Sequence, residues 1–259
     1  MQLTSFENLI QENIKFKEAK LFKVKDSNFK YKRIPIEVIY PNNKKGPLII
    51  ETPFLFSFGI TERRNQETKK LIGYSIPVCL WAKDEEPSSK EKAFYETINN
   101  LTSLAQQHLE TEFGADAASS LSSPLYYKQE EYLDKKGKKK TRNSESAAPI
   151  LYAKLIYSER SKKILSLFKG KGGKDLSPFK YIDQYFTVKL ALIVEGIFMS
   201  KSVTSLQIKV HECYVKPLKP RESLLSFEDE GWDDVTDEKS DVEDLTEILE
   251  KLTLSDEDQ

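Results

Sequence analysis

Basic side chains gather in three stretches of this sequence, and two of these stretches also contain aromatic residues. The stretches are FKYKR at 29–33, KGKKKTR at 136–142, and a longer one that runs from RSKK at 160–163 through FKGKGGK to FKYIDQYF at 179–186. Lysine and arginine contact phosphates, and unpaired bases stack on aromatic rings, each stacked base contributing about 1–3 kcal/mol. A few such contacts suffice for binding without sequence readout, so these residue types predict a surface for single-stranded nucleic acid.

Two sets of residues are candidates for that surface, chosen from the chemistry of their side chains. The candidates for phosphate contact are Lys30, Lys32, Arg33, Lys135, Lys136, Lys138, Lys139, Lys140, Arg142, Lys154, Arg160, Lys162, Lys163, Lys169, Lys171, Lys174, Lys180 and Lys209. The candidates for base stacking are Tyr31, Tyr152, Tyr157, Phe168, Phe179, Tyr181 and Tyr185.

Some of these residues also have a purely structural interpretation. Runs of charge are usually solvated surfaces, so for the basic run 135–142 a solvated loop and a phosphate-contacting loop both stay open. Aromatic residues in strands usually pack in a core, and for Tyr152 and Tyr157 core packing and base stacking both stay open. The three phenylalanines of FLFSF (54–58) follow the period of a half-buried strand, which predicts that they lie in the core.

Charge is divided unevenly along the chain. The 259 residues carry a net charge of −1, from 40 basic and 41 acidic residues. Residues 228–259 hold 15 acidic and two basic residues, a net charge of −13, so residues 1–227 keep 38 basic and 26 acidic residues, a net charge of +12. An acidic segment of this kind resembles a polyanion. We therefore expect the tail to compete with nucleic acid for the basic body.

The acidic tail also carries an apolar pattern. In DVEDLTEILEKL (241–252) the apolar residues recur at three and four positions, as on one face of a helix. We expect this segment to fold on a groove of a partner, such as a replication protein. The alternative is a tail that only solubilises, although that role needs no apolar stripe. The candidate partner-binding residues are Trp232, Val242, Leu245, Ile248, Leu249 and Leu252.

Catalytic residue types are present, but not in the arrangement of a familiar site. His108, in a helical pattern and expected to be packed, and His211, in a strand pattern, have no metal-ligand spacing around them. The glycine-rich KGKGGKD (169–175) lacks the first glycine of a phosphate-binding loop and has Asp175 where Ser or Thr would bind magnesium. We interpret it as a flexible basic loop, and we expect no enzyme, no metal and no cofactor.

Cysteine content and hydropathy predict the cellular compartment of the protein. Cys79 and Cys213 lie in apolar strand-like runs, which predicts two buried thiols in a reducing compartment. The first 20 residues contain no apolar leader, and no apolar stretch approaches the ~20 residues of a membrane-spanning helix. The expectation is a soluble intracellular protein with no membrane partner.

The elements that must position these residues are mainly β. Strand patterns occur at 33–41, 47–60, 71–81, 150–159 and 185–217, separated by turn residues. Within the last of these, MSKS at 199–202 is expected to join two long antiparallel strands. Strands that do not alternate with helices favour a small β barrel over α/β layers.

A few residues predict the details of that barrel. Gly196 is expected to supply a strand bend, and Pro77 suggests an edge strand or a bulge. One helix is predicted at 88–114, where Ser88 and Glu91 form a capping box and Gly114 is a plausible stop.

The segment that follows this helix has a different composition. Residues 115–149 are rich in small, polar and charged side chains, which predicts a flexible insertion or long loop.

Five sequence blocks, taken together, resemble the single-stranded-DNA-binding proteins of nucleocytoplasmic large DNA viruses, of the asfarvirus and marseillevirus type. The resemblance runs over most of 1–217 and is weakest at 115–149. The blocks are FSFGITE (56–62), GYSIPVCLW (73–81), EKAFYE (91–96), LYAKLIYS (151–158) and VEGIFMSKSVTSLQIKVHE (194–212).

This resemblance implies an OB-like barrel core. Together with the residue patterns it predicts a mainly β (α+β) fold, with an OB-like antiparallel β-barrel core, one main helix, long basic loops and a disordered acidic C-terminal tail. We expect an OB-like domain over 1–226 and the tail over 227–259. The implied function is binding of single-stranded DNA without strong sequence preference, in viral DNA replication, repair and recombination. RNA binding and homo-oligomers stay open.

The alternative is a non-enzymatic viral structural or transcription-associated factor that binds proteins. The expected location is the host cell cytoplasm, in a viral replication compartment, or the nucleus. Packaging in the virion is left open.

Overall fold

The computed structural model describes residues 2–24, 28–82, 85–133, 138–144 and 147–217. Residues 1–218 form one compact unit. The predicted tail helix, its candidate residues and the domain boundary expected at 226 all lie outside the described residues.

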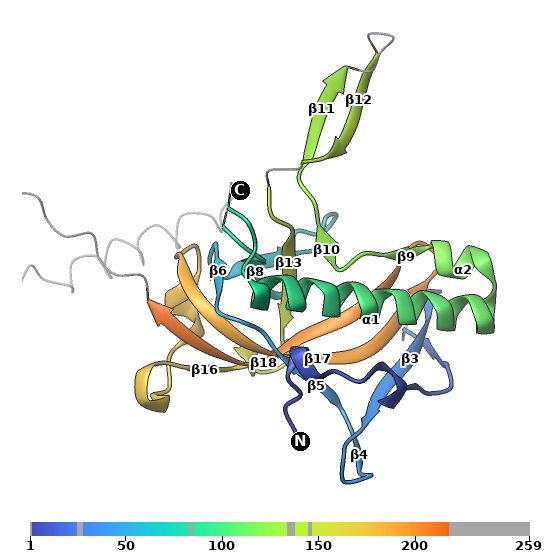
Figure 1. Ribbon diagram of the computed structural model, residues 1–259, viewed down its shortest axis with the longest axis horizontal. Helices are drawn as coiled ribbons and strands as arrows, with labels where there is room; N and C mark the ends of the chain where they lie inside the picture. The colour runs from blue at the N-terminus through green and yellow to red at the C-terminus, as the bar shows by residue number, and fades with distance from the viewer. Residues whose placement is uncertain (1, 25–27, 83–84, 134–137, 145–146, 218–259) are drawn as a thin grey trace, which may run out of the picture. The chain divides into compact units, whose positions relative to one another are not determined.

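A closed five-stranded barrel forms the centre of the compact unit (Figure 1). Its order is β17–β6–β8–β13–β18, and β18 pairs with β17 again to complete the ring. All neighbours are antiparallel except β13 and β18, which are parallel. With one long helix beside it, this is the mainly β, OB-like barrel that the sequence predicts. The strands are β6 (Leu55–Ser57), β8 (Leu71–Cys79), β13 (Ile150–Leu155), β17 (Phe186–Ser200) and β18 (Thr204–Pro217).

Further strands and helices extend the barrel. The remaining strands are β1 (Ile14–Phe16), β2 (Lys20–Lys23), β3 (Lys30–Ile39), β4 (Lys45–Gly46), β5 (Leu48–Glu51), β7 (Thr61–Arg64), β9 (Leu121–Ser122), β10 (Leu125–Tyr126), β11 (Gln129–Leu133), β12 (Lys139–Asn143), β14 (Tyr157–Ser158), β15 (Lys163–Ile164) and β16 (Leu167–Lys169). The helices are α1 (Ser89–Phe113) and α2 (Ala115–Ser119), with short 3-10 turns at Phe6–Asn8, Gln11–Asn13, Lys171–Gly173 and Pro178–Tyr181.

Strands β17 and β18 are much longer than the barrel needs. Along its second edge, β17 pairs in turn with β6, β5 and β3, and β18 pairs with β16, β13 and β9. The expected turn lies between the two strands, where the backbone N–H of Ser200 donates to the carbonyl oxygen of Val203. One continuous ribbon therefore carries most of the sheet.

The capping box of α1 forms as the sequence predicts. The backbone N–H of Ser88 donates to the Glu91 carboxylate, and the N–H of Glu91 donates to the Ser88 hydroxyl. Gly114 ends the helix with a φ of 88°. The apolar side of α1 packs against the barrel, with Phe94, Ile98 and Leu101 among its buried residues.

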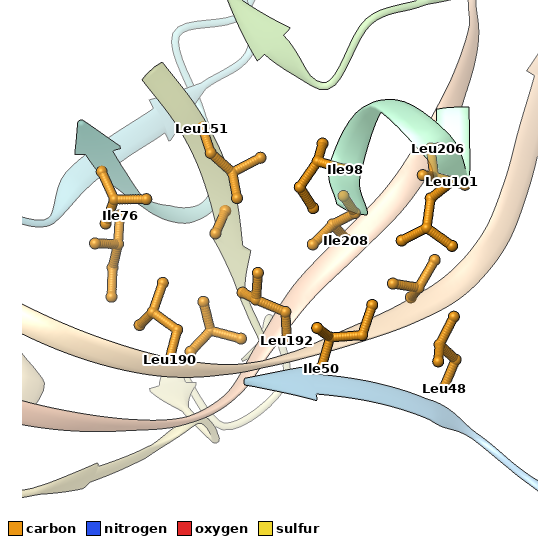
Figure 2. Packing of buried hydrophobic residues seen from close by; sticks show 14 of the residues in the cluster. Leu48, Ile50, Ile76, Ile98, Leu101, Leu151, Leu190, Leu192, Leu206 and Ile208 are labelled. Atoms are coloured by element: carbon orange, nitrogen blue, oxygen red, sulfur yellow. The ribbon is translucent and has the colours of Figure 1, made fainter. Parts of the chain in front are cut away.

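Apolar side chains from the strands and from α1 meet in one core (Figure 2). Alternation along the strands places every second residue inside, as the sequence predicts for 33–41. The strand residues labelled in the figure come from β5, β8, β13, β17 and β18, and α1 adds Ile98 and Leu101. Residues from distant parts of the chain thus fix the barrel.

The three phenylalanines of β6 and its flanks do not lie in this core, which corrects the prediction. Phe54 and Phe58 are exposed and Phe56 is half-buried, whereas Leu55 and Ser57 are buried. The alternation of the segment is as expected, but the opposite set of residues faces inward. A period of two shows which residues share a face, not which face is buried.

Pro77 does not mark an edge strand, because β8 has partners on both sides. The carbonyl oxygen of Pro77 accepts from the N–H of Phe58 and the hydroxyl of Ser57. The missing N–H of the proline points to the same edge. On that edge β7 pairs with β8 as far as Ser75 and β6 pairs with it from Val78 onward, so Pro77 falls where one partner replaces the other.

Regular elements occupy much of the segment 115–149, where the sequence predicts a long loop. β9 pairs with β18 and β10 pairs with β13. β11 and β12 form a two-stranded hairpin, which projects away from the barrel in Figure 1. At its base, the N–H of Ser144 donates to the carbonyl oxygen of Lys128. We call residues 129–133 and 138–143 the arm.

Gly196 makes the bend that the sequence predicts. Its φ is 146°, and the pairing of β17 with β18 shifts register between Val194 and Gly196. A Cβ atom at this position would lie 2.1 Å from the carbonyl oxygen of Ile34 on β3. Only glycine allows the two backbones to approach this closely.

Replacing Gly196 with alanine is therefore expected to lower the free energy of unfolding by about 2 kcal/mol or more, because both the backbone angle and the contact with Ile34 oppose a side chain. Urea unfolding measures this. Gly172→Ala is the control, since Gly172 also has a positive φ, 70°, but a Cβ atom there would meet no other atom within 4 Å. The control substitution is expected to lower the free energy of unfolding by only about 1 kcal/mol. Equal losses in both variants would contradict the close approach.

Candidate nucleic-acid interface

The outward side of the extended sheet forms one continuous surface, which we call the barrel face. Cross-strand partners in a sheet point to the same side, so the pairing defines its members. Arg33 is paired with Phe198, Gly196 with Gln207, and Lys154 with both Lys209 and Ser75. The face crosses β2, β3, β17, β18, β13, β8 and β7. Its residues include Lys20, Phe22, Tyr31, Arg33, Thr61, Arg63, Ser75, Tyr152, Lys154, Glu195, Phe198, Gln207 and Lys209.

Three cations lie together near the middle of the barrel face. Lys154 on β13, Lys209 on β18 and Arg63 on β7 are all partly buried. Lys154 Nζ donates to Gln207 Oε1 at 3.0 Å, and Lys209 Nζ is 2.8 Å from Glu195 Oε1. Arg63 makes no ion pair with any residue that the structure describes. We call Arg63, Lys154 and Lys209 the cation cluster.

The cation cluster holds its charges at an electrostatic cost. Burial lowers the pKa of Lys154, and the nearby charges of Arg63 and Lys209 lower it further, against a smaller opposite effect of Glu195. Burial also lowers the pKa of Arg63. An anion bound here would relieve this repulsion, so the cluster is suited to a phosphate group.

Aromatic rings flank the cation cluster along the barrel face, with Phe22, Tyr126 and Tyr152 exposed and Tyr31 and Phe198 half-buried. On the β3 side, the rings of Phe22 and Tyr31 stack at 5.3 Å, and Tyr31 contacts Phe198 at 5.2 Å. On the β13 side, Tyr152 is 48% exposed and meets Tyr126 edge-on at 6.1 Å. Of the two interpretations open for Tyr152, the structure therefore excludes burial in the core. Aromatic rings that reach the surface are platforms for unpaired bases.

The arm presents further basic side chains beside Tyr126. The guanidinium of Arg142 lies over the ring of Tyr132, with its Cζ atom 5.5 Å from the ring centroid, and Lys139 pairs with Glu131 at 3.3 Å. The predicted candidates Lys138, Lys139, Lys140 and Arg142 are all exposed on this element. Lys135 and Lys136 lie outside the described residues.

The remaining basic candidates do not share the barrel face. Lys30 and Lys32 alternate with Tyr31 and Arg33 on β3 and so point to its other side, where Lys32 Nζ lies 4.7 Å from the centre of the Phe113 ring. The others belong to the segment 160–180, joined to the ribbon through the pairing of β16 with the C-terminal part of β18. Figure 1 shows β16 and β3 at opposite ends of this ribbon. The candidates at that far end are Arg160, Lys162, Lys163, Lys169, Lys171, Lys174 and Lys180.

Several stacking candidates prove to be packed. Phe168 is 3% exposed because β16 turns it into the core, so it cannot receive a base. Tyr181 stacks on Phe168 and is half-buried, and Tyr157 packs edge-on against Tyr74. In the segment 160–181, the aromatic residues Phe168 and Tyr181 therefore pack in or against the core, although they stand next to basic residues in the sequence.

Phe179 and Tyr185 are exposed but lie away from the cation cluster. Tyr185 contacts the rings of Phe56 and Phe58, at 5.7 and 6.3 Å between centroids. Phe179 contacts Tyr74 at 6.0 Å. Among the ring contacts of the described residues, none joins Phe179 or Tyr185 to the rings that flank the cation cluster.

The structure adds residues that the sequence patterns did not select. Arg63 stands in a charged connection. Phe22 stands in the lysine-containing segment KLFK (20–23), outside the three stretches chosen from the sequence, and Phe198 and Tyr126 lie outside any basic run. Lys20 is opposite Arg33 in the β2–β3 pairing. The two lysines that enclose apolar residues in KLFK at 20–23 are a usable signal, but Arg63 joins Lys154 only through strand pairing.

The other titratable candidates are placed as structural residues. His108 stacks on Phe16 at 4.4 Å, which confirms the packed histidine, and burial lowers its pKa. Cys79 and Cys213 are free thiols. In the part of the chain that the structure describes, no group of three or more His, Cys, Asp or Glu residues could hold a metal ion. No described helix is long and apolar enough to span a membrane.

The chain belongs to the family described as "Protein of unknown function (DUF2738)", whose model matches residues 14–243. No curated protein matches it. Among solved structures, it is similar to the single-stranded DNA-binding protein from bacteriophage Enc34 in complex with ssDNA, at 13% identity and a TM-score of 0.43 over 80% of this chain and 97% of that chain. A second structure of that phage protein matches at 14% identity and a TM-score of 0.41, over 86% and 98%. This likeness is too distant to assign a ligand.

The cation cluster predicts how the pKa of Lys154 responds to a neighbour. Lys209→Met removes a repelling charge and frees the attracting carboxylate of Glu195, so the pKa of Lys154 is expected to rise toward its ordinary value. Because folding lowers this pKa, Lys154 disfavours the folded state while charged, and stability rises as the pH climbs through the folded-state value. Carbon-detected NMR titration of lysine Cε atoms at alkaline pH measures the shift. Lys180→Met, at the far end of the ribbon, is the control, and an unchanged or lowered Lys154 pKa in Lys209→Met would contradict the cluster.

Proposed function

We propose that this member of the DUF2738 family binds single-stranded DNA on the barrel face, without strong sequence preference. Phosphates contact the cation cluster and Arg33, and bases stack on the aromatic rings to either side. The observation that carries the proposal is the group of partly buried, mutually repelling cations between exposed aromatic rings. The clustered cations disfavour the folded state, and the rings that reach the surface leave apolar area in water, so both features support the binding of a ligand here.

Single-stranded nucleic acid suits this arrangement better than duplex. A ring can stack on a base only where the base is free of its own neighbours, as in an unpaired strand. A duplex offers its phosphates but hides the faces of its bases. The 2′-hydroxyl is the group that distinguishes RNA, and binding of RNA belongs to the same test.

The biological role is proposed on the sequence blocks that resemble viral single-stranded-DNA-binding proteins. In that role the protein protects and organises single strands during viral DNA replication, repair and recombination, as a binding protein without catalytic activity. The proposed location is the cytoplasmic replication compartment or the nucleus of the host cell.

The acidic segment 228–259 is proposed to modulate this binding. Its net charge of −13 opposes the +12 of residues 1–227, so it resembles the nucleic acid in charge. A tail of this kind lowers weak binding by competition and leaves its apolar residues, with Trp232, for replication proteins.

A basic surface also fits an acidic protein, so a viral structural or transcription-associated factor is the second candidate. The two functions differ in what the barrel face prefers. A strand-binding protein favours single strand over duplex, and its affinity falls with salt at a slope near −0.7 per neutralised phosphate. A factor that binds only proteins shows neither property.

Fluorescence anisotropy of labelled oligo-dT across a salt series, with a duplex of equal length, tests the proposal. The double variant Arg63→Gln/Lys154→Gln is expected to bind more weakly and to reduce the salt slope by about 0.7 to 1.4, since one or two phosphates lose a partner. Lys171→Gln/Lys174→Gln removes the same charge at the far end of the ribbon and is expected to change binding much less. Equal effects of the two pairs would place the strand elsewhere.

The aromatic part of the site has its own variant. Tyr152→Ala is expected to lower affinity roughly 5- to 150-fold, which corresponds to about 1–3 kcal/mol for a lost stacked base. Tyr214→Ala is the control, because Tyr214 is an exposed tyrosine opposite Lys169 of β16, at the far end of the ribbon from β3. Weak binding of wild type to both single strand and duplex would reject the proposed function in favour of protein binding.

The same assay on residues 1–227 tests the tail. Tighter oligo-dT binding after truncation is expected, because a competing polyanion is removed. Unchanged binding would leave the tail as a partner-binding segment only.

A further inference from the structure

A pocket of about 370 Å³ opens on the barrel face between β3 and the ribbon. Its walls combine charged, amide and aromatic side chains, unlike a purely electrostatic groove. Part of its lining comes from Ile34 and Pro35 of β3 and from Gly196 and Ile197 of β17. The side chains on which the argument rests are Lys20, Phe22, Arg33, Glu195, Gln207 and Lys209. A protein holds an unpaired base by hydrogen bonds to the edge of the base and by stacking on its face. This pocket offers polar groups for the edge and flat side chains for the face.

Glu195 is the unexpected residue of this pocket. It is the residue at the register shift of β17, directly before Gly196, and its side chain is 39% exposed. A carboxylate on a phosphate-binding surface repels the backbone of the strand, so it weakens general affinity. Its pairing with Lys209 at 2.8 Å holds both groups at the same wall of the pocket. The pair therefore presents a cationic donor beside two carboxylate oxygens.

The four bases differ in how they match such a pair. Guanine has O6, N1–H and N2–H₂ in a row on its Watson–Crick edge, so O6 can accept from lysine while the two donors meet the two carboxylate oxygens. Thymine offers one donor between two acceptors. Cytosine and adenine place a ring-nitrogen acceptor where the carboxylate needs a donor.

We propose that this pocket reads guanine, with Glu195 accepting from N1–H and N2–H₂ and Lys209 donating to O6. Phe22 and the planar guanidinium of Arg33 form walls against which the base lies, and the Gln207 amide adds a polar group beside Lys209. The inference rests on the proposed function and refines it. Single-strand binders usually draw their preferences from stacking and backbone flexibility. Here one hydrogen-bonded position is added to a tolerant surface.

The test measures binding of the full chain to oligo-dT with one central guanine, adenine, cytosine or inosine. One guanine per strand cannot form a quadruplex, and inosine lacks only the exocyclic amino group. The guanine oligonucleotide is expected to bind at least roughly tenfold more tightly than oligo-dT, with inosine between them, because a single hydrogen bond to a charged group already contributes about that much. Adenine controls for purine stacking.

Glu195→Gln is expected to abolish the difference between guanine and inosine, while binding of oligo-dT stays equal or becomes tighter because a repelling charge is gone. Glu51→Gln is the matched control, since Glu51 pairs with Lys189 of the same ribbon at 2.6 Å but lies outside the pocket. It is expected to keep the guanine preference.

Two results would overturn the inference while leaving the proposed function intact. One is equal wild-type affinity for guanine and oligo-dT, and the other is a guanine–inosine difference that survives Glu195→Gln. If Glu195→Gln binds every oligonucleotide more tightly and wild type shows no guanine preference, Glu195 only repels the strand and reads no base. Failure of wild type to bind any of these strands would reject both proposals.

Discussion

The pairing of β17 with β18 is the constraint on which the structure depends. These strands stay antiparallel from Phe186 and Pro217 to the turn at their other end, far beyond the length of the barrel. Nearly every other strand of the barrel sheet is hydrogen-bonded either to β17 or β18, or to a strand that is itself paired with one of them. A ribbon of this length must twist and bend, and Gly196 with its register shift allows β3 to follow the bend. The inward residues build the core, and the outward residues become a surface whose composition is free to serve a ligand.

The cation cluster exists because strand pairing overrides charge repulsion. Arg63, Lys154 and Lys209 come from three strands and meet only when the barrel closes. Burial and like charge both disfavour Lys154 in its charged form, while the large apolar core outweighs this local cost. Such a site is prepared for an anion before the anion arrives, which lowers the reorganisation that binding requires. Glu195 and Gln207 keep two of these cations oriented without neutralising the whole cluster.

Local patterns in the sequence predict local structure well. The capping box at Ser88 and Glu91 forms, and the alternation at 33–41 gives the correct inward set, because neighbours in sequence determine both. The FLFSF segment fails for a different reason, since its alternation is correct but only the closed barrel decides which face is buried. Phe168 likewise enters the core through β16. The basic runs identify an affinity for anions, yet Arg63 and Lys154 are 91 positions apart in number and only the fold brings them together.

Photo-cross-linking with oligo-dT that carries 5-iododeoxyuridine tests the central claim most directly, because it reports which rings touch bases. Mass spectrometry of the full-length protein then locates each cross-link. The barrel face predicts cross-links at Tyr152 and at the Phe22–Tyr31 pair on the two sides of the cation cluster. Cross-links confined to residues 160–181, with none on the barrel face, would contradict the account and place the strand at the far end of the ribbon.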